Sequence, residues 1–206
     1  MPSYKLYYFH GRGRAEPARL MLAAAGLPYE DIRIEYEQWP EYKPKMPMGQ
    51  APVLEVDGTM ICQSVAIARF VAKESGRAGK TNMEQAWADM MADGFVDMLN
   101  KMADYVWYEE DEARKAEKKK TFFDTTLPEF LGYFEKLLVA NNGGGGFFVG
   151  DGLTHAEAFF LCLSDDIIAE KPNVLSPYPK LAALVERIKT YPGIKEWLAK
   201  RPQTPF

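Results

Sequence analysis

The hydrophobic pattern of this chain changes once, at residues 75–79, and that change restricts the folds open to it. Short strand-like runs alternate with helical runs before this point, and no β-branched run of convincing strand length follows it. The connecting residues Ser75-Gly76-Arg77-Ala78-Gly79 are small and flexible. The sequence therefore predicts two domains, a mixed α/β domain over residues 1–79 and an all-helical domain over residues 80–206.

The first domain has the element order β-α-β followed by β-β-α. The Asp57-Gly58 pair suits the positive dihedral angles of a two-residue hairpin turn and joins the last two strands. We expect strands at residues 4–9, 29–35, 52–56 and 59–62, and helices at 14–26 and 64–74. This order predicts a small mixed four-stranded sheet covered by helices.

The second domain contains only helical patterns. Thr81 with Glu84, and Thr154 with Glu157, have the spacing of capping boxes. The first helix carries apolar residues at three- and four-residue steps, namely Trp87, Met91, Phe95, Met98, Met102 and Val106. Further helices are expected at 114–139, 154–168, 181–190 and 193–200. The glycine run 143–146 is interpreted as a surface loop, because no Lys-Ser or Lys-Thr pair accompanies it as in a phosphate-binding loop.

Composition excludes several functional classes. The net charge of -4 comes from 25 basic and 29 acidic residues spread along the chain, which argues against nucleic-acid binding. No apolar run reaches about 18 residues and no signal-peptide pattern is present, so we expect a cytoplasmic protein without a membrane partner. Cys62 and Cys162 are expected to be buried free thiols, while His10 and His155 have no local partners for a triad or a metal site.

Tyr8 stands at the end of the first expected strand, directly before Gly11-Arg12-Gly13-Arg14. A tyrosine in that place either fills the core or serves chemistry. Alternation groups Tyr8 with Tyr4 and separates it from Tyr7, so periodicity alone does not choose between these roles.

Two further segments favour a peptide-like ligand. Pro52 follows Gln50-Ala51 at the start of a strand, where a proline is often cis and leaves adjacent backbone groups pointing outward. Ser64 is a good N-cap for the helix at 64–74, and the exposed start of that helix, with Gln63 and Ser64 beside it, can also bind a carboxylate.

Several segments in the same order make the chain similar to one family nearly end to end. They are Tyr4-Lys5-Leu6-Tyr7-Tyr8-Phe9, Gly13-Arg14-Ala15-Glu16, Trp39-Pro40, Pro52-Val53-Leu54-Glu55-Val56-Asp57-Gly58, Gln63-Ser64-Val65-Ala66-Ile67-Ala68-Arg69 and Lys200-Arg201-Pro202. Together they resemble the sigma class of glutathione transferases, which includes haematopoietic-type prostaglandin D synthases, molluscan and helminth transferases, and the S-crystallins of cephalopod lenses.

This resemblance implies a thioredoxin-like first domain, an all-helical second domain and a homodimer. It implies that Tyr8 donates its hydroxyl to the sulfur of glutathione, the co-substrate, and that Arg14 adds positive potential, so that the thiol pKa falls from about 8.5. The remaining glutathione ligands implied by the resemblance are Trp39, Lys43, Gln50, Ala51, Pro52, Gln63, Ser64 and, from the partner subunit, Asp97. No metal is required.

Asp97 also has some support from the helix itself. Asp93 and Asp97 are four residues apart, so two like charges share a face. A ligand ammonium group could compensate Asp97, or Lys101 one turn later could do so locally. The helix alone does not decide between them.

The resemblance is weakest around the second substrate. An apolar electrophile pocket is implied from Phe9, Phe159, Leu163 and Phe206, with Trp107 or Tyr108 as additions. The chain departs from the vertebrate prostaglandin enzymes at Val96-Asp97, where they carry adjacent aspartates, and at Asp104, where they carry an aromatic residue. These departures put an interface metal and prostaglandin specificity in doubt. Glu157 also replaces the aspartate usual in the family.

Three functions follow from these patterns. The first is conjugation of glutathione to small hydrophobic electrophiles, the second is glutathione-dependent prostaglandin D synthesis, and the third is a structural S-crystallin or ligand carrier. The intact Gln63-Ser64 pair and the length of 206 residues, which leaves no room for a large insertion, favour an enzyme over a crystallin.

Overall fold

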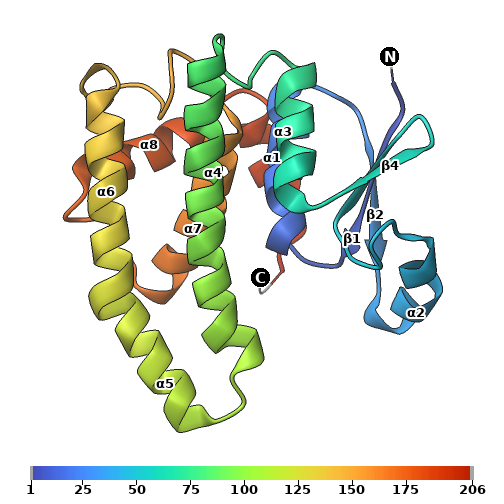
Figure 1. Ribbon diagram of the computed structural model, residues 1–206, viewed down its shortest axis with the longest axis horizontal. Coiled ribbons are helices and arrows are strands. Elements are labelled where there is room, and N and C mark those ends of the chain that lie inside the picture. Colours follow the sequence, from blue (N-terminus) through green and yellow to red (C-terminus); the bar gives the residue numbers. More distant parts are fainter. Residues whose placement is uncertain (1, 205–206) are drawn as a thin grey trace. The chain divides into compact units, whose positions relative to one another are not determined.

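The structure, a computed structural model, describes residues 2–204, and the chain divides into two compact units (Figure 1). One unit takes the chain up to Ala78 and again from Ile188 onward, and the other takes Gly79–Arg187. The first unit holds a four-stranded mixed sheet with helices, and the second is helical throughout its described residues, which confirms the predicted fold class. That residues 1–79 and residues 80–206 form two separate domains stays a prediction.

The sheet of the first unit has the strand order β2-β1-β3-β4. Its strands are β1 (Tyr4–Phe9), β2 (Glu30–Ile34), β3 (Val53–Val56) and β4 (Thr59–Cys62). The pair β1–β2 is parallel and the other two pairs are antiparallel, so the chain crosses over once through helix α1 (Glu16–Ala25). At the β3–β4 turn, Asp57 and Gly58 both have positive φ, at 47° and 84°, as the hairpin prediction requires.

Helices α1 and α3 (Ser64–Glu74) pack together on one side of this sheet, and the short α2 (Trp39–Tyr42) lies on the other (Figure 1). Helix α1 follows a 3₁₀ turn at Gly13–Ala15 and ends at Gly26 in the left-handed conformation. Apolar side chains such as Leu6, Leu20 and Leu54 are fully buried, and each contributes about 1.5 to 3 kcal/mol by burial.

The C-terminal helix α9 (Ile194–Lys200) packs against α1 within the first unit. Its approach depends on Gly193, because a Cβ there would lie 2.1 Å from the carbonyl oxygen of Ala23. The φ of Gly193 is also positive, at 80°. Only glycine satisfies both conditions at this position.

The second unit is built on α4 and α7, which pack along one another, with α6 beside them (Figure 1). Its helices are α4 (Asn82–Ala103), α5 (Glu112–Thr121), α6 (Leu127–Ala140), α7 (His155–Glu170) and α8 (Pro179–Lys189). Rings from α4, α6, α7 and the loop before α7 form one aromatic core cluster of Phe95, Phe134, Phe160 and Phe148, with the Phe95 and Phe134 centroids 4.1 Å apart.

The helix expected over residues 114–139 is interrupted by a π-helical stretch, Phe122–Thr126. Pro128 follows it and lacks the N–H group that would bond to the carbonyl of Asp124, so a regular α-helical ladder cannot continue there. A second π-helical stretch, Asp104–Tyr108, follows α4 directly. It contains Val106, the last residue of the apolar repeat expected for this helix. Trp87, at the other end of that repeat, is 37% exposed and is not part of the core.

The two predicted capping boxes have different outcomes. At α7 both halves form: the Thr154 hydroxyl oxygen accepts from the Ala156 N–H at 3.2 Å, and Glu157 accepts from the Thr154 N–H at 2.7 Å. At α4 the Thr81 hydroxyl caps the Glu84 N–H, but the Glu84 carboxylate accepts from Lys80 instead of Thr81. The expected bond from the Thr81 N–H to the Glu84 carboxylate was therefore wrong, because the donor is the N–H of Lys80, one residue earlier.

No helix among residues 2–204 is long and apolar enough to cross a membrane. Cys162 is buried and Cys62 is only partly buried, because Cys62 ends β4 at the edge of the sheet. The expectation of burial was therefore wrong for Cys62, although both cysteines are free thiols as expected.

Candidate functional site

The hydroxyl of Tyr8 is held in place by the turn that follows β1. The Arg14 backbone N–H donates to the Tyr8 hydroxyl oxygen at 3.1 Å. Between them, Gly13 has a φ of +38°, and a Cβ at Gly13 would lie 2.6 Å from that same oxygen. The oxygen thus accepts one hydrogen bond while its own proton remains for a second partner.

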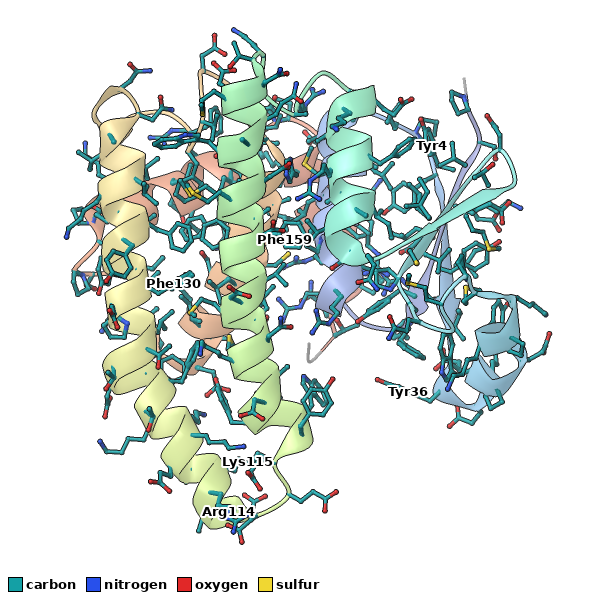
Figure 2. All side chains as sticks on the ribbon, viewed as in Figure 1. Tyr4, Tyr36, Arg114, Lys115, Phe130 and Phe159 are labelled. Carbon is teal, nitrogen blue, oxygen red and sulfur yellow. The ribbon has the colours of Figure 1, made fainter. Side chains whose placement is uncertain are left out.

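The three tyrosines of β1 have separate roles. Tyr4 is 4% exposed and fills the space between α3 and the sheet (Figure 2). Tyr7 donates its hydroxyl to Glu55 at 2.8 Å, and burial with that carboxylate raises the pKa of Tyr7 to about 12. Tyr8 alone of the three has its hydroxyl at the Gly13–Arg14 turn, and this contact distinguishes it from Tyr4, which alternation did not.

Two effects act in opposite directions on the Tyr8 phenol. Burial raises the pKa of Tyr8, and this effect is larger than the lowering by the Arg14 amide and by the charges of Arg14 and Arg19. Tyr8 is consequently protonated at neutral pH. A protonated phenol in this position is a hydrogen-bond donor toward an anionic atom.

The side chains of Gln50 and Gln63 meet beyond the ends of β3 and β4. The Gln63 amide nitrogen lies 3.2 Å from the Gln50 amide oxygen and 3.7 Å from the sulfur of Met48. The Ala51–Pro52 peptide is cis, as the sequence suggested. Ala51 lies outside the strand register, which ends at the Tyr7–Val53 pair, so its backbone groups are not part of the ladder.

Gln63 occupies the N-cap position of α3 with a φ of +75°, and Ser64 is the first helical residue, 8% exposed. Ser64 is therefore not the N-cap that the sequence predicted; the left-handed turn at Gln63 moves the cap one residue earlier. The Gln63 side chain does not cap this helix start. Its first N–H groups and the helix dipole suit a carboxylate ligand. A strained non-glycine residue of this kind is typical of functional sites.

Aromatic rings cluster next to Tyr8 in the same unit. Phe9 lies 5.5 Å from Tyr8, 5.1 Å from Trp39 and 4.8 Å from Tyr36, measured between ring centroids. Figure 2 shows Tyr36 beside α2, where it is exposed. Lys43 is also exposed at the end of α2. Trp39 thus begins α2, Lys43 directly follows it, and Phe9 packs against Trp39.

The other predicted site residues lie in the second unit. Asp97 is exposed on α4, and Lys101 forms no ion pair with it in the described part of the chain, so local compensation by Lys101 is absent there. Phe159 and Leu163 are buried on α7, at 1% and 0% exposure, and Figure 2 shows Phe159 beside α4. Trp107 and Tyr108 are exposed in the π-helical stretch after α4. Phe206 lies outside the described residues.

Sequence reasoning missed two interactions. Arg19 is fully buried in α1, and the only local signal was a charged residue inside the otherwise apolar run from Pro17 to Ala25. His155 has no local partner for a triad or a metal site in the sequence, and the structure adds a distant partner: its Nε2 lies 3.0 Å from Asp89, 66 residues away on α4. No local spacing reveals that pair. Among residues 2–204, no group of three or more His, Cys, Asp or Glu side chains could hold a metal ion.

Two family models match the chain. Residues 4–73 match the N-terminal domain of glutathione S-transferase, and residues 96–201 match the C-terminal domain of glutathione S-transferase. The first range contains the Tyr8, Gln50 and Gln63 positions described above. The second contains Asp97 and three of the four aromatic core residues of the helical unit, Phe134, Phe148 and Phe160.

Similar proteins extend this match over the whole chain. S-crystallin SL11 of Nototodarus sloanii is 43% identical over 100% of both chains, and hematopoietic prostaglandin D synthase of Gallus gallus is 41% identical over 99% of both. Among solved structures, rat hPGDS complexed with a quinoline has a TM-score of 0.90 at 36% identity, covering 100% of both chains. A nematode C. elegans specific GST has a TM-score of 0.90 at 39% identity with the same coverage. The chain belongs to the glutathione transferase family, and its relatives are those of the sigma class.

Proposed function

We propose that this protein is an enzyme that conjugates the thiolate of glutathione to small hydrophobic electrophiles. One observation carries the proposal: the Tyr8 hydroxyl oxygen accepts from the Arg14 N–H, which orients the phenol and keeps its proton for another acceptor. A thiolate sulfur is such an acceptor. Family membership supplies glutathione as the co-substrate.

The chemistry is a nucleophilic substitution or addition. The glutathione thiol loses its proton to solvent, and the Tyr8 O–H donates a hydrogen bond to the resulting thiolate. With an aryl chloride, the sulfur forms a bond to the ring carbon and chloride leaves with its electron pair. The Arg14 side chain adds positive potential that favours the thiolate over the thiol. No metal takes part in any of these steps.

The tripeptide itself is bound by the remaining residues of the first unit. Gln63, Ser64 and the uncapped start of α3 take the γ-glutamyl carboxylate. Gln50 and the backbone of Ala51 before Pro52 pair with the cysteinyl part, while Trp39 and Lys43 hold the glycyl carboxylate. The Gln50–Gln63 hydrogen bond supports this assignment, because it joins two of these ligands.

The other assignments concern the second substrate, the assembly and the location. We assign the electrophile pocket to Phe9, Trp107, Phe159, Leu163 and Phe206, in a cytoplasmic homodimer whose partner subunit contributes Asp97. The exposed position of Asp97 on α4 supports this assignment, because its carboxylate is accessible to a ligand ammonium group.

Retention on glutathione-agarose, followed by turnover with a chloronitrobenzene, tests this function. The proposal predicts both retention and turnover. Retention without turnover would contradict conjugation and favour a ligand carrier or a crystallin, and the S-crystallin relatives make that outcome meaningful. Failure of retention would contradict every glutathione ligand assigned above.

Prostaglandin D synthesis is the second candidate, because a relative carrying that name is 41% identical over nearly the full length of both chains. In that case glutathione acts as a cofactor for isomerisation and is not consumed. Conversion of prostaglandin H2 to prostaglandin D2 without net loss of glutathione would favour this candidate over conjugation.

A further inference from the structure

Five side chains of the first unit form an alternating chain of charges behind β1. Arg201 pairs with Glu16 at 2.9 Å, Glu16 with Arg19 at 3.3 Å, Arg19 with Asp31 at 3.1 Å, and Asp31 with Arg33 at 2.9 Å. This chain of charges runs from Arg201, the residue after α9, through α1 to β2.

Arg19 is the centre of this chain and is fully buried, at 0% exposure. Its Nη1 donates to the carbonyl oxygen of Gly11 at 2.7 Å, in the turn between β1 and Arg14. Its guanidinium carbon lies 5.9 Å from the centroid of the Tyr8 ring. The same side chain thus contacts the turn that orients the Tyr8 hydroxyl and places a positive charge beside the ring.

Glu16 connects this arrangement to the C-terminal helix. Its Oε1 accepts from the Trp197 indole N–H at 2.8 Å as well as from Arg201, while its Oε2 faces Arg19. Both carboxylates that neutralise Arg19 are thus shared with another guanidinium group. Shared carboxylates compensate a buried cation less completely than dedicated partners do.

We propose that Arg19 is a positioning residue for Tyr8, because it holds the turn at Gly11. Its buried positive charge also favours negative charge on the Tyr8 oxygen and on a glutathione sulfur that is hydrogen-bonded to Tyr8. The part concerning the sulfur rests on the proposed function. The part concerning the phenol is a property of the unliganded protein.

The groups that act on the Tyr8 hydroxyl define what a titration would report. Burial raises the pKa of Tyr8, the Arg14 amide and the charges of Arg14 and Arg19 lower it, and the neighbouring Tyr36 raises it. Removing the Arg19 charge takes away one lowering effect. Removing the Asp31 charge leaves Arg19 less neutralised and acts in the opposite direction.

The test is the ultraviolet titration of Tyr8 in the unliganded protein, read as the difference between each protein and the same protein carrying Tyr8→Phe. Arg19→Met, which keeps the volume and removes the charge, is expected to raise the pKa of Tyr8 by about 0.5 to 1. Asp31→Asn is expected to lower it by a comparable amount. Arg19→Lys keeps the charge and should lie between wild type and Arg19→Met.

If Arg19 has a purely structural role, the variants lose stability but the pKa of Tyr8 does not shift in opposite directions in Arg19→Met and Asp31→Asn. Shifts in the same direction for Arg19→Met and Asp31→Asn, or no shift in either, would overturn the proposal. If Arg19→Met does not fold, Asp31→Asn decides, because the Asp31 side chain is 20% exposed and its replacement is nearly isosteric. Retention of each variant on glutathione-agarose reports separately on the proposed function, so the two can fail independently.

Discussion

The Arg14 backbone N–H donates to the Tyr8 hydroxyl oxygen across a distance of 3.1 Å. This hydrogen bond fixes the orientation of the phenol, because an oxygen that accepts from a backbone amide must direct its own proton elsewhere. The turn that makes the bond possible depends on a glycine in the left-handed region, and this dependence leads to the first prediction.

Gly13→Ala should lower the rate of conjugation about 100-fold while the protein remains folded. The added Cβ would lie 2.6 Å from the Tyr8 oxygen, so the hydroxyl must move. The measurement is kcat/KM with a chloronitrobenzene. Gly58→Ala is the matched control: its φ of +84° imposes a similar backbone strain, but no atom lies within 4 Å of the added Cβ. Equal activity losses in both variants would contradict a specific effect on Tyr8.

Gln63→Gly should stabilise the fold by about 1 kcal/mol and weaken glutathione binding. The substitution relieves a φ of +75° but removes the amide that bonds to Gln50. Chemical denaturation and calorimetric titration with glutathione measure the two effects. Asn142→Gly is the control, since it relieves a φ of +52° at a residue that is assigned no role in glutathione binding, and should change stability alone. Unchanged glutathione affinity in Gln63→Gly would contradict the assigned role of Gln63.

Glu157 should make stability depend on pH. Burial raises the pKa of this carboxyl above its ordinary value of 4.5, against the hydrogen bonds it accepts from Phe148 and Thr154. A raised folded pKa means that the stabilising contribution of the protonated form is complete below the unfolded pKa and is lost as pH rises through the folded pKa. The unfolding free energy of wild type minus that of Glu157→Gln should therefore fall as pH rises from about pH 4 through the raised folded pKa, by about 1.4 kcal/mol for each pH unit separating the two pKa values.

Denaturant unfolding of both proteins across this pH range measures that difference. Glu84→Gln is the control for loss of a capping carboxylate, because Glu84 accepts from the Lys80 N–H at the partly exposed start of α4. A difference for Glu157→Gln that rises with pH would reverse the assigned direction.

Asp97→Asn should weaken glutathione binding about tenfold with little effect on stability. The reason is that Asp97 is exposed on α4, and we assign it to a ligand ammonium group at the site of the partner subunit. Asp93→Asn removes the same charge one turn earlier on the helix. Equal losses of affinity in the two variants would indicate a general effect of charge and would count against the specific role of Asp97.

Local patterns predicted most of the fold. The Asp57-Gly58 turn and the Thr154–Glu157 box form as expected, because each depends on residues within four positions of one another. The π-helical stretch before Pro128 was not predicted, although the proline offered a signal. The Glu84 carboxylate accepts from the N–H of Lys80, where the sequence predicts the N–H of Thr81. Helix propensity does not distinguish these two donors.

The candidate site was less predictable, because it depends on tertiary contacts. Periodicity could not separate Tyr8 from Tyr4, and the separation came from the Gly13–Arg14 turn. The positive φ of Gln63 and the burial of Arg19 follow from packing between elements, and the only local sign of either is that Arg19 interrupts an apolar run in α1. The same holds for the pairing of His155 with Asp89, which requires α4 and α7 to be packed together.

The central claim is that Tyr8 stabilises the thiolate of glutathione, and titration of the bound thiol tests it most directly. The thiolate absorbs in the ultraviolet, so its appearance with pH can be followed in wild type and in Tyr8→Phe at saturating glutathione. We expect a pKa below the free thiol value of about 8.5 in wild type and a return toward that value in the variant, with binding retained. An unchanged thiol pKa and rate in Tyr8→Phe would contradict the account and assign the role to Arg14 or Tyr7.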